Sequence, residues 1–292
     1  MIFNQLLING IIAGSIYALV ASGFTLIYSA TRFIHFAHGA IAAAGAYLVY
    51  TFFVLLGLNF YLASFLAVLS TALVGLFFFA IIYRPLQKRK SSNAIMLIAG
   101  LGLMILIENL LLLIFGADVK SLNFLEVARG KEIFGAIITP LQMVIVAISV
   151  LLLIFLQFFV KKTKFGKKML AVADNPELAD TTGINAKVIQ YAGFGIGSAL
   201  AGVAGILIGL EQNIEPVMGV MLIVKGFTGA IIGGVTSLPG AILGSYLLGL
   251  SENFGIWYLP SGYKDAIAFG LLLIFLLVKP NGILGINKGV RE

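Results

Sequence analysis

Long apolar runs separated by short polar breaks occupy almost the whole chain. A helix needs about 20 apolar residues to cross the hydrocarbon core of a membrane, whereas barrel strands would alternate in polarity. The pattern therefore predicts an all-α fold, a polytopic transmembrane helical bundle of about eight to ten spans, forming a single domain over residues 1–292. The nine apolar runs lie at residues 6–28, 37–56, 61–83, 94–115, 141–160, 191–210, 218–235, 241–254 and 266–278.

The seventh and eighth runs, at residues 218–235 and 241–254, leave two alternatives open. The eighth run is short and rich in glycine, so the pair forms either two separate spans or one re-entrant or broken segment. Two separate spans bring the count to nine, and an odd number of spans places the two termini on opposite sides of the membrane.

Clusters of basic residues predict the orientation. They gather at residues 84–90, at residues 161–190 and in the C-terminal tail with Lys288 and Arg291. Cytoplasmic loops carry an excess of lysine and arginine, so these regions are expected inside, with the C-terminus. Residues 118–138, whose charges are balanced, are expected outside, and so is the N-terminus.

Composition excludes several classes of function. Hydrophobic residues make up 60% of the chain and charged residues 11%, against about a quarter charged in soluble domains. The net charge of +7 follows from the basic loops and does not require nucleic acid. The chain has no cysteine and only two histidines, which excludes disulfides and thiolate chemistry and is too few for a structural zinc site. No metal or cofactor is expected.

The longest polar interruption, residues 161–190, carries six lysines and no arginine. Within it, Asn175 is a suitable N-cap, Pro176 suits the first helical position, Glu177 favours the positive end of the dipole, and Gly183 can end the helix. These residues predict a helix of about two turns, roughly 10 Å long, which must lie outside the bilayer. Such an element is suited to docking.

A weak internal similarity suggests an inverted repeat. Residues 22–27, SGFTLI, resemble residues 204–209, AGILIG, and Gly39 follows the first polar break as Gly219 follows the second. Five spans lie between the matched helices, so the two copies would run in opposite directions, as in many transporters. Chance similarity between helices rich in glycine and alanine is the alternative.

Two polar side chains interrupt the fourth run near its middle. Glu108 and Asn109 lie within MLIAGLGLMILIENLLLLIFG, where an ionisable group costs several kcal/mol unless it is paired or hydrated. The two interpretations are a residue that faces a translocation route and a structural hydrogen bond to a neighbouring helix.

Three further residues are candidates for the route. His35 and His38 would share one face of a helix if the segment is helical. The polar break RFIHFAHG that contains them either turns the chain or presents the end of a half-helix to the route. Lys225, within the seventh run, can reach the interface, pair with an acidic group or line the route. The chain has no GxxxxGK[ST] loop and is not expected to hydrolyse a nucleotide itself.

Three separated motifs resemble the permease subunits of bacterial branched-chain amino acid ABC importers. These are LLINGIIAGSIYALVASGFTLIYSATRFIHFAHG, ADNPELADTTGIN and MGVMLIVKGFTGAIIGGVTSLPGAILGSYLLGL, in this order. The chain is most similar to the first, shorter permease of the pair in such systems. Many relatives continue FAHG with an acidic residue, whereas Ala40 follows here, which puts any transfer of function to this turn in doubt.

The resemblance implies a complex in the cytoplasmic (inner) membrane that has two permeases, two cytoplasmic ATPase subunits and an external solute-binding protein. The permease itself is not an enzyme and would work by alternating access. A docking helix on the ATPase would be formed, by motif position, from Ala173, Asp174, Asn175, Pro176, Glu177 and Gly183.

Two other classes of protein remain as alternatives. One is a secondary transporter coupled to an ion gradient, for which Glu108 would be the coupling residue. The other is a membrane scaffold without a route. Within the importer family, urea, amides or other amino acids are alternative substrates.

Overall fold

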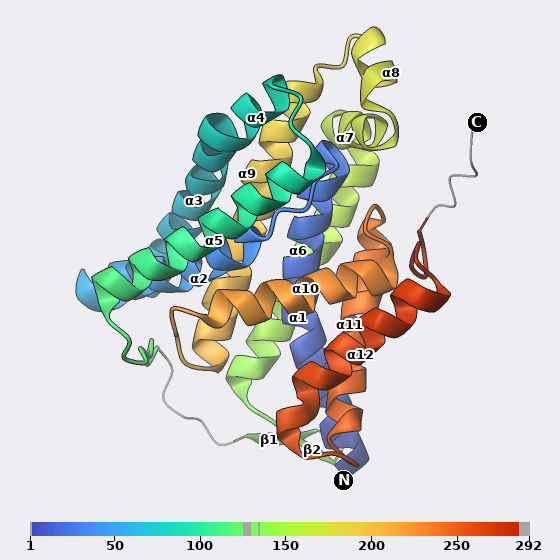
Figure 1. Ribbon diagram of the computed structural model, residues 1–292. Coiled ribbons are helices and arrows are strands. Elements are labelled where there is room, and N and C mark those ends of the chain that lie inside the picture. The colour runs from blue at the N-terminus through green and yellow to red at the C-terminus, as the bar shows by residue number, and fades with distance from the viewer. Residues whose placement is uncertain (1, 125–129, 134, 286–292) are drawn as a thin grey trace.

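The computed structural model describes residues 2–124, 130–133 and 135–285 as one bundle of helices with a small β-hairpin (Figure 1). Some charged residues used to predict the orientation in the membrane lie outside the described residues. They are Glu126 and Arg129, expected on the outer side, and Lys288 and Arg291, expected on the inner side. The elements are α1 (Ile2–Thr31), α2 (Ala37–Tyr50), α3 (Phe60–Phe78), α4 (Arg84–Lys88), α5 (Asn93–Phe115), β1 (Lys131–Ile133), β2 (Ala136–Ile138), α6 (Pro140–Lys162), α7 (Lys164–Asp174), α8 (Pro176–Thr181), α9 (Ala186–Glu211), α10 (Met218–Gly233), α11 (Leu238–Gly255) and α12 (Lys264–Val278). Strands β1 and β2 are antiparallel.

Local sequence explains where most of these helices begin. Ser92 caps α5. Thr139 and Gln142 form a capping box at the start of α6, in which the side chain of each residue accepts a hydrogen bond from the backbone N–H of the other. Two π-helical turns, Thr51–Leu55 and Phe79–Tyr83, extend α2 and α3 without ending them. The apolar runs therefore fold as long helices, which confirms the predicted polytopic helical bundle.

The number of spans differs from the expected nine. Among the described residues, seven helical segments are long and apolar enough to cross a membrane, and α10 with α11 forms a pair bent by 117°. Helix α10 has 16 residues, about 24 Å, which is short of the hydrocarbon thickness. Gly234, at φ 115°, ends it, and Ser237 caps α11. Of the two alternatives that the sequence left open, the structure therefore favours one re-entrant or broken segment.

Helix α10 begins within the bundle beside the start of α2, and α11 ends beside the N-terminus of α1. Phe254, at the end of α11, packs on Phe3 near the N-terminus, with ring centroids 5.1 Å apart. The turn between the helices lies at the other end, where Ile283 N–H donates to the carbonyl of Ile232 (2.8 Å). The two helices thus form a sharply bent hairpin within the bundle.

Small residues allow the central helices to approach each other closely. A Cβ built on Gly23 would lie 2.8 Å from the carbonyl oxygen of Gly197, and one on Gly197 would lie 2.8 Å from that of Gly23. Gly39 and Gly219 abut each other in the same reciprocal way. The absence of a side chain at these glycines therefore allows the helices to pack closely. The second contact joins the two glycines matched by the repeat hypothesis, which stays a prediction.

Two non-helical segments enter the bundle. Residues 32–36 join α1 to α2, and residues 212–217 join α9 to α10. Phe33, His35 and Ile214 within them are almost fully buried. Irregular backbone at membrane depth is tolerated where protein surrounds it, and it commonly marks the functional region of a transporter.

Candidate functional site

The short polar helix predicted within residues 161–190 is present as α8. Asn175 Oδ1 accepts the backbone N–H groups of Glu177 and Leu178, both at 3.1 Å, and Gly183 has the left-handed φ of 81°. Helix α8 lies beyond α7 at one end of the bundle (Figure 1). The prediction of a capped helix outside the spanning segments is confirmed, because each of its signals is local.

Ala173 and Asp174 do not belong to this helix, which corrects the expected extent of the docking helix. They are the last residues of α7, and Asn175 between the helices is extended, with φ −147° and ψ 106°. A residue that precedes proline avoids the helical region, so Pro176 separates the two helices. The segment is therefore a helix–turn–helix formed by α7 and α8.

The exposed face of α8 carries a residue that the sequence analysis did not single out. Leu178 is 61% exposed, whereas its neighbour Ala179 is buried. Asp180 Oδ1 accepts the N–H of Ala186 (3.1 Å), which fixes α8 to the start of α9. An apolar side chain on a short helix within a polar loop is the signal that could have identified it.

Glu108 lies at the rim of a cavity of about 410 Å³ on the α5 side of the bundle. Its Oε1 is buried and has no hydrogen-bond partner in the described part of the chain. Asn109, beside it, donates to the carbonyl of Ile105 within its own helix (2.8 Å). The hydrogen bond to a neighbouring helix that would make Glu108 a structural residue is thus not found among the described residues.

The residues immediately before α10 also line this cavity. The lining residues are Glu108, Asn109, Leu112, Ala117, Val119, Glu215, Pro216 and Val217. Val217, the N-cap of α10, provides no side-chain cap. The cavity therefore combines two carboxylates with an apolar wall, next to the second non-helical segment.

Both histidines are fully buried beside aromatic rings. His35 Nδ1 lies 2.7 Å from the hydroxyl of Tyr83, and His38 Nε2 lies 3.2 Å from the carbonyl oxygen of Val20. His35 precedes α2 and His38 is in its first turn, with ring centroids 6.3 Å apart. Neither ring is accessible to a solute in this conformation. Their expected role in the route stays a prediction.

Lys225 forms a buried ionic cluster, which resolves the three alternatives left by its sequence position. Its Nζ lies 2.6 Å from Glu252 Oε1 and 2.7 Å from Asp265 Oδ1. Tyr17 donates its hydroxyl to the other oxygen of Glu252 (3.0 Å). The cluster joins α1, α10, α11 and α12. Glu252 was missed in the sequence, although a carboxylate within an apolar run was the available signal.

The candidate route residues do not share one cavity in the described part of the chain. Glu108 and Asn109 line the same cavity, whereas Lys225 is 6% exposed and the histidines are enclosed. No group of three or more metal-ligating side chains occurs among the described residues.

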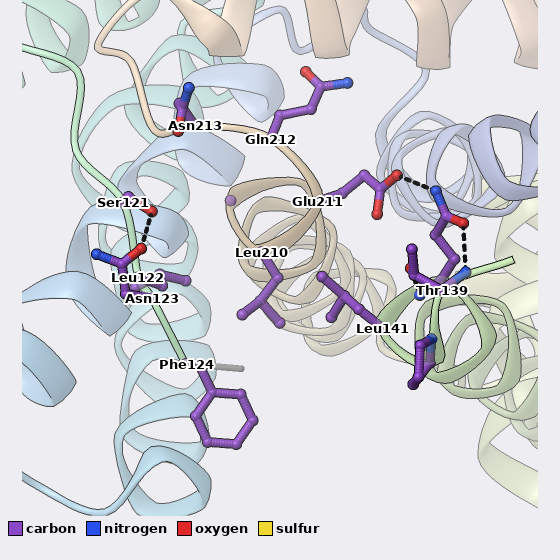
Figure 2. Close-up of a pocket in the computed structure, with 13 residues that line it drawn as sticks. Ser121, Leu122, Asn123, Phe124, Thr139, Leu141, Leu210, Glu211, Gln212 and Asn213 are labelled. Atoms are coloured by element: carbon purple, nitrogen blue, oxygen red, sulfur yellow. Dashed lines mark hydrogen bonds between the residues drawn. The ribbon is translucent and has the colours of Figure 1, made fainter. Parts of the chain in front are cut away.

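A second cavity, of about 460 Å³, opens where α6 begins and α9 ends (Figure 2). Gln142 donates its amide to Glu211 Oε1 (2.9 Å), and this pair forms one wall. Across the cavity, Ser121 donates to Asn123 Oδ1 (3.0 Å) beside Phe124. It lies at the end of the bundle opposite α8, where the sequence places the outer side.

Comparison with known proteins identifies the family. The family described as "Branched-chain amino acid transport system / permease component" matches residues 6–276. The permease protein BraD of the high-affinity branched-chain amino acid transport system of Pseudomonas aeruginosa is 36% identical, over 97% of this chain and 96% of that protein. Escherichia coli K12 LivH is 35% identical over 97% of this chain and 96% of LivH. A probable LivH of Methanocaldococcus jannaschii is 32% identical over 97% of this chain and 93% of that protein.

A solved structure supports the fold. PsaBC from Streptococcus pneumoniae, in complex with Fab, aligns with a TM-score of 0.52 over 94% of this chain and 91% of that one, at 16% identity. At this identity the likeness concerns the fold alone. The family match and the relatives, together with the seven apolar helices, show that this multi-pass membrane protein belongs to the family of branched-chain amino acid transport system permeases.

Proposed function

We propose that the chain is the permease subunit of an ATP-driven importer that moves branched-chain amino acids across the cytoplasmic membrane. The observation that carries this proposal is the nearly full-length similarity to high-affinity branched-chain amino acid permeases. Its partners are then a second permease subunit, two cytoplasmic ATPase subunits and an external solute-binding protein. ATP hydrolysis takes place on the ATPase subunits, and this chain provides a route.

Helix α8 is the proposed docking element for an ATPase subunit. It is capped, lies outside the spanning helices, and presents Leu178 to solvent. An exposed leucine on a rigid short helix provides an apolar anchor for a pocket on a partner. The lysines of residues 161–190 support a cytoplasmic position for this element, on the side where the ATPase would bind.

The proposed route passes the cavity between α5 and the start of α10. A carboxylate within a membrane helix must face protein or water, so this side of the bundle cannot face lipid. The second permease would cover it and complete the route. Glu108 would contact the ammonium group of the amino acid, and Leu112, Val119 and Val217 would contact its aliphatic side chain.

Alternating access follows from this arrangement. When ATP binding closes the two ATPase subunits, α8 moves with the subunit that holds it, and α7 moves with α8. The helices then open the cavity to the outside, where the solute-binding protein delivers the amino acid. Release of the hydrolysis products restores the inward opening.

Uptake into vesicles tests the proposed function. Vesicles containing the chain with its second permease and ATPases should accumulate labelled leucine only when the binding protein and ATP are present. Competition by unlabelled valine, isoleucine, urea and amides would define the substrate. Accumulation driven by an ion gradient without any ATPase would instead establish the secondary-transporter alternative.

Truncation of Leu178 should weaken the association with the ATPase. For Leu178→Ala we expect a dissociation constant raised about fivefold, because an anchor truncated at an interface costs on the order of 1 kcal/mol. Co-purification and binding titrations measure the change. Val188→Ala is a matched control, since Val188 is also exposed at this end but lies outside α8. Equal binding by both variants and the unmodified chain would refute docking through α8.

A further inference from the structure

Arg32 joins the coupling segment, formed by α7 and α8, directly to the non-helical break at residues 32–36. The residue lies immediately after α1, and its Nη2 donates to the carbonyl oxygen of Ala173 in the last turn of α7. The two residues are 141 positions apart in the chain. A guanidinium group has five N–H donors in a rigid plane, and one of them links the turn after α1 to the backbone of α7.

The backbone at Arg32 is unusual. Its φ is 61°, in the left-handed region, and its N–H donates to the carbonyl of Tyr28 (2.7 Å) to close α1. A residue other than glycine seldom adopts this conformation, and it persists where surrounding contacts require it. The turn at Arg32 is therefore held by its neighbours and is sensitive to their position.

The segment that follows Arg32 is packed tightly against other helices. Phe33 stacks on Tyr83 with ring centroids 4.7 Å apart, and His35 Nδ1 lies 2.7 Å from the Tyr83 hydroxyl. Both side chains are buried, and α2 begins two residues after His35. Close-packed interiors transmit displacements, so a shift of Arg32 must reach the start of α2.

On its other side, Arg32 borders a cavity of about 490 Å³. The cavity separates the end of α7 from the α10–α11 turn and from the segment after α12, with walls that include Asp174, Thr236 and Asn281. The end of α7 therefore borders this cavity, and its Ala173 carbonyl is bonded to Arg32.

We propose that Arg32 is a positioning residue that transmits the displacement of α7 and α8 to the break between α1 and α2. The Ala173 carbonyl pulls on the guanidinium group, and the packed segment with Phe33 and His35 carries the shift to α2. This inference rests on the proposed function, because it requires an ATPase that moves α8.

The test compares the number of leucine molecules imported per ATP hydrolysed. For Arg32→Ala we expect a rate of ATP hydrolysis within about twofold of that of the unmodified complex. The number of leucine molecules imported per ATP should fall roughly tenfold, which corresponds to the free energy of one hydrogen bond from a charged group. Arg32→Lys keeps a charged donor and should recover most of the ratio. Arg84→Ala is the matched control, because Arg84 bonds Tyr191 at the same end without contacting the coupling segment.

Two outcomes would overturn the inference. One is an unchanged ratio in Arg32→Ala, and the other is an equal fall in the Arg84→Ala control. If Arg32→Ala fails to assemble, Tyr83→Phe removes the hydroxyl next to His35 and should lower the same ratio; a normal ratio there is also contrary to the inference. Absence of ATP-driven uptake by the unmodified complex would refute the proposed function instead, so the two failures are distinguishable.

Discussion

Replacing Lys225 by methionine should lower the free energy of unfolding by about 3–5 kcal/mol, the usual cost of removing one partner of a buried ion pair. The side chain of Glu252 is 1% exposed and has Lys225 Nζ at 2.6 Å. Methionine fills a similar volume but carries no charge. Glu252 would then keep the hydrogen bond from Tyr17 as its remaining polar contact in the cluster.

Unfolding of the purified protein in detergent, by heat or denaturant, measures this effect. The double variant Lys225→Met with Glu252→Gln should recover most of the loss, because the buried negative charge is also removed. Asp265→Asn alone should cost only about 1 kcal/mol, since the Asp265 side chain is 47% exposed and solvent screens its charge. A double variant as unstable as Lys225→Met alone would contradict the pairing.

The position of this cluster explains why its effect should be large. It connects α10 and α11 to α12 and, through Tyr17, to α1. The two helices of the hairpin have only a short turn between them, so the buried pair fixes their relative position within the bundle. Loss of Lys225 is therefore expected to loosen the whole hairpin.

Replacing Glu108 by glutamine should lower leucine import at least tenfold without loss of assembly. A hydrogen bond to a charged group contributes about 1.5–3 kcal/mol, which corresponds to roughly 10- to 100-fold in affinity. Glutamine keeps the shape of the side chain but removes the charge that would attract the ammonium group. Initial rates of uptake at several concentrations of loaded binding protein measure the change.

The neighbouring amide provides a matched control. Asn109 is bonded to Ile105 within α5, so Asn109→Ala should change import by less than about threefold. Glu108→Asp retains the charge and should retain part of the activity. Full import by both Glu108→Gln and Glu108→Ala would remove Glu108 from the route.

Features that depend on near neighbours in the chain were predictable from the sequence. The cap at Asn175, the separation at Pro176 and the left-handed Gly183 involve residues that lie close together in the chain. The membrane class and the basic end likewise follow from composition and loop charge alone. Each of these signals acts over a few residues, so no tertiary information was needed.

Features that depend on residues far apart were not predictable in the same way. Lys225 was left with three alternatives because its partner Glu252 is on another helix, and the burial of His35 depends on Tyr83 and other distant rings. The choice between two spans and one broken segment at residues 218–254 stayed open because hydropathy does not report a bend of 117°.

By itself, the sequence determined that this is a polytopic helical membrane protein with a capped helix in its most basic loop. The tertiary structure decided that α10 and α11 form a hairpin, that Lys225 lies between two carboxylates, and that Arg32 reaches Ala173. The reason is physical: caps and hydrophobic runs act through adjacent residues, whereas ion pairs and helix reversals depend on which helices pack together.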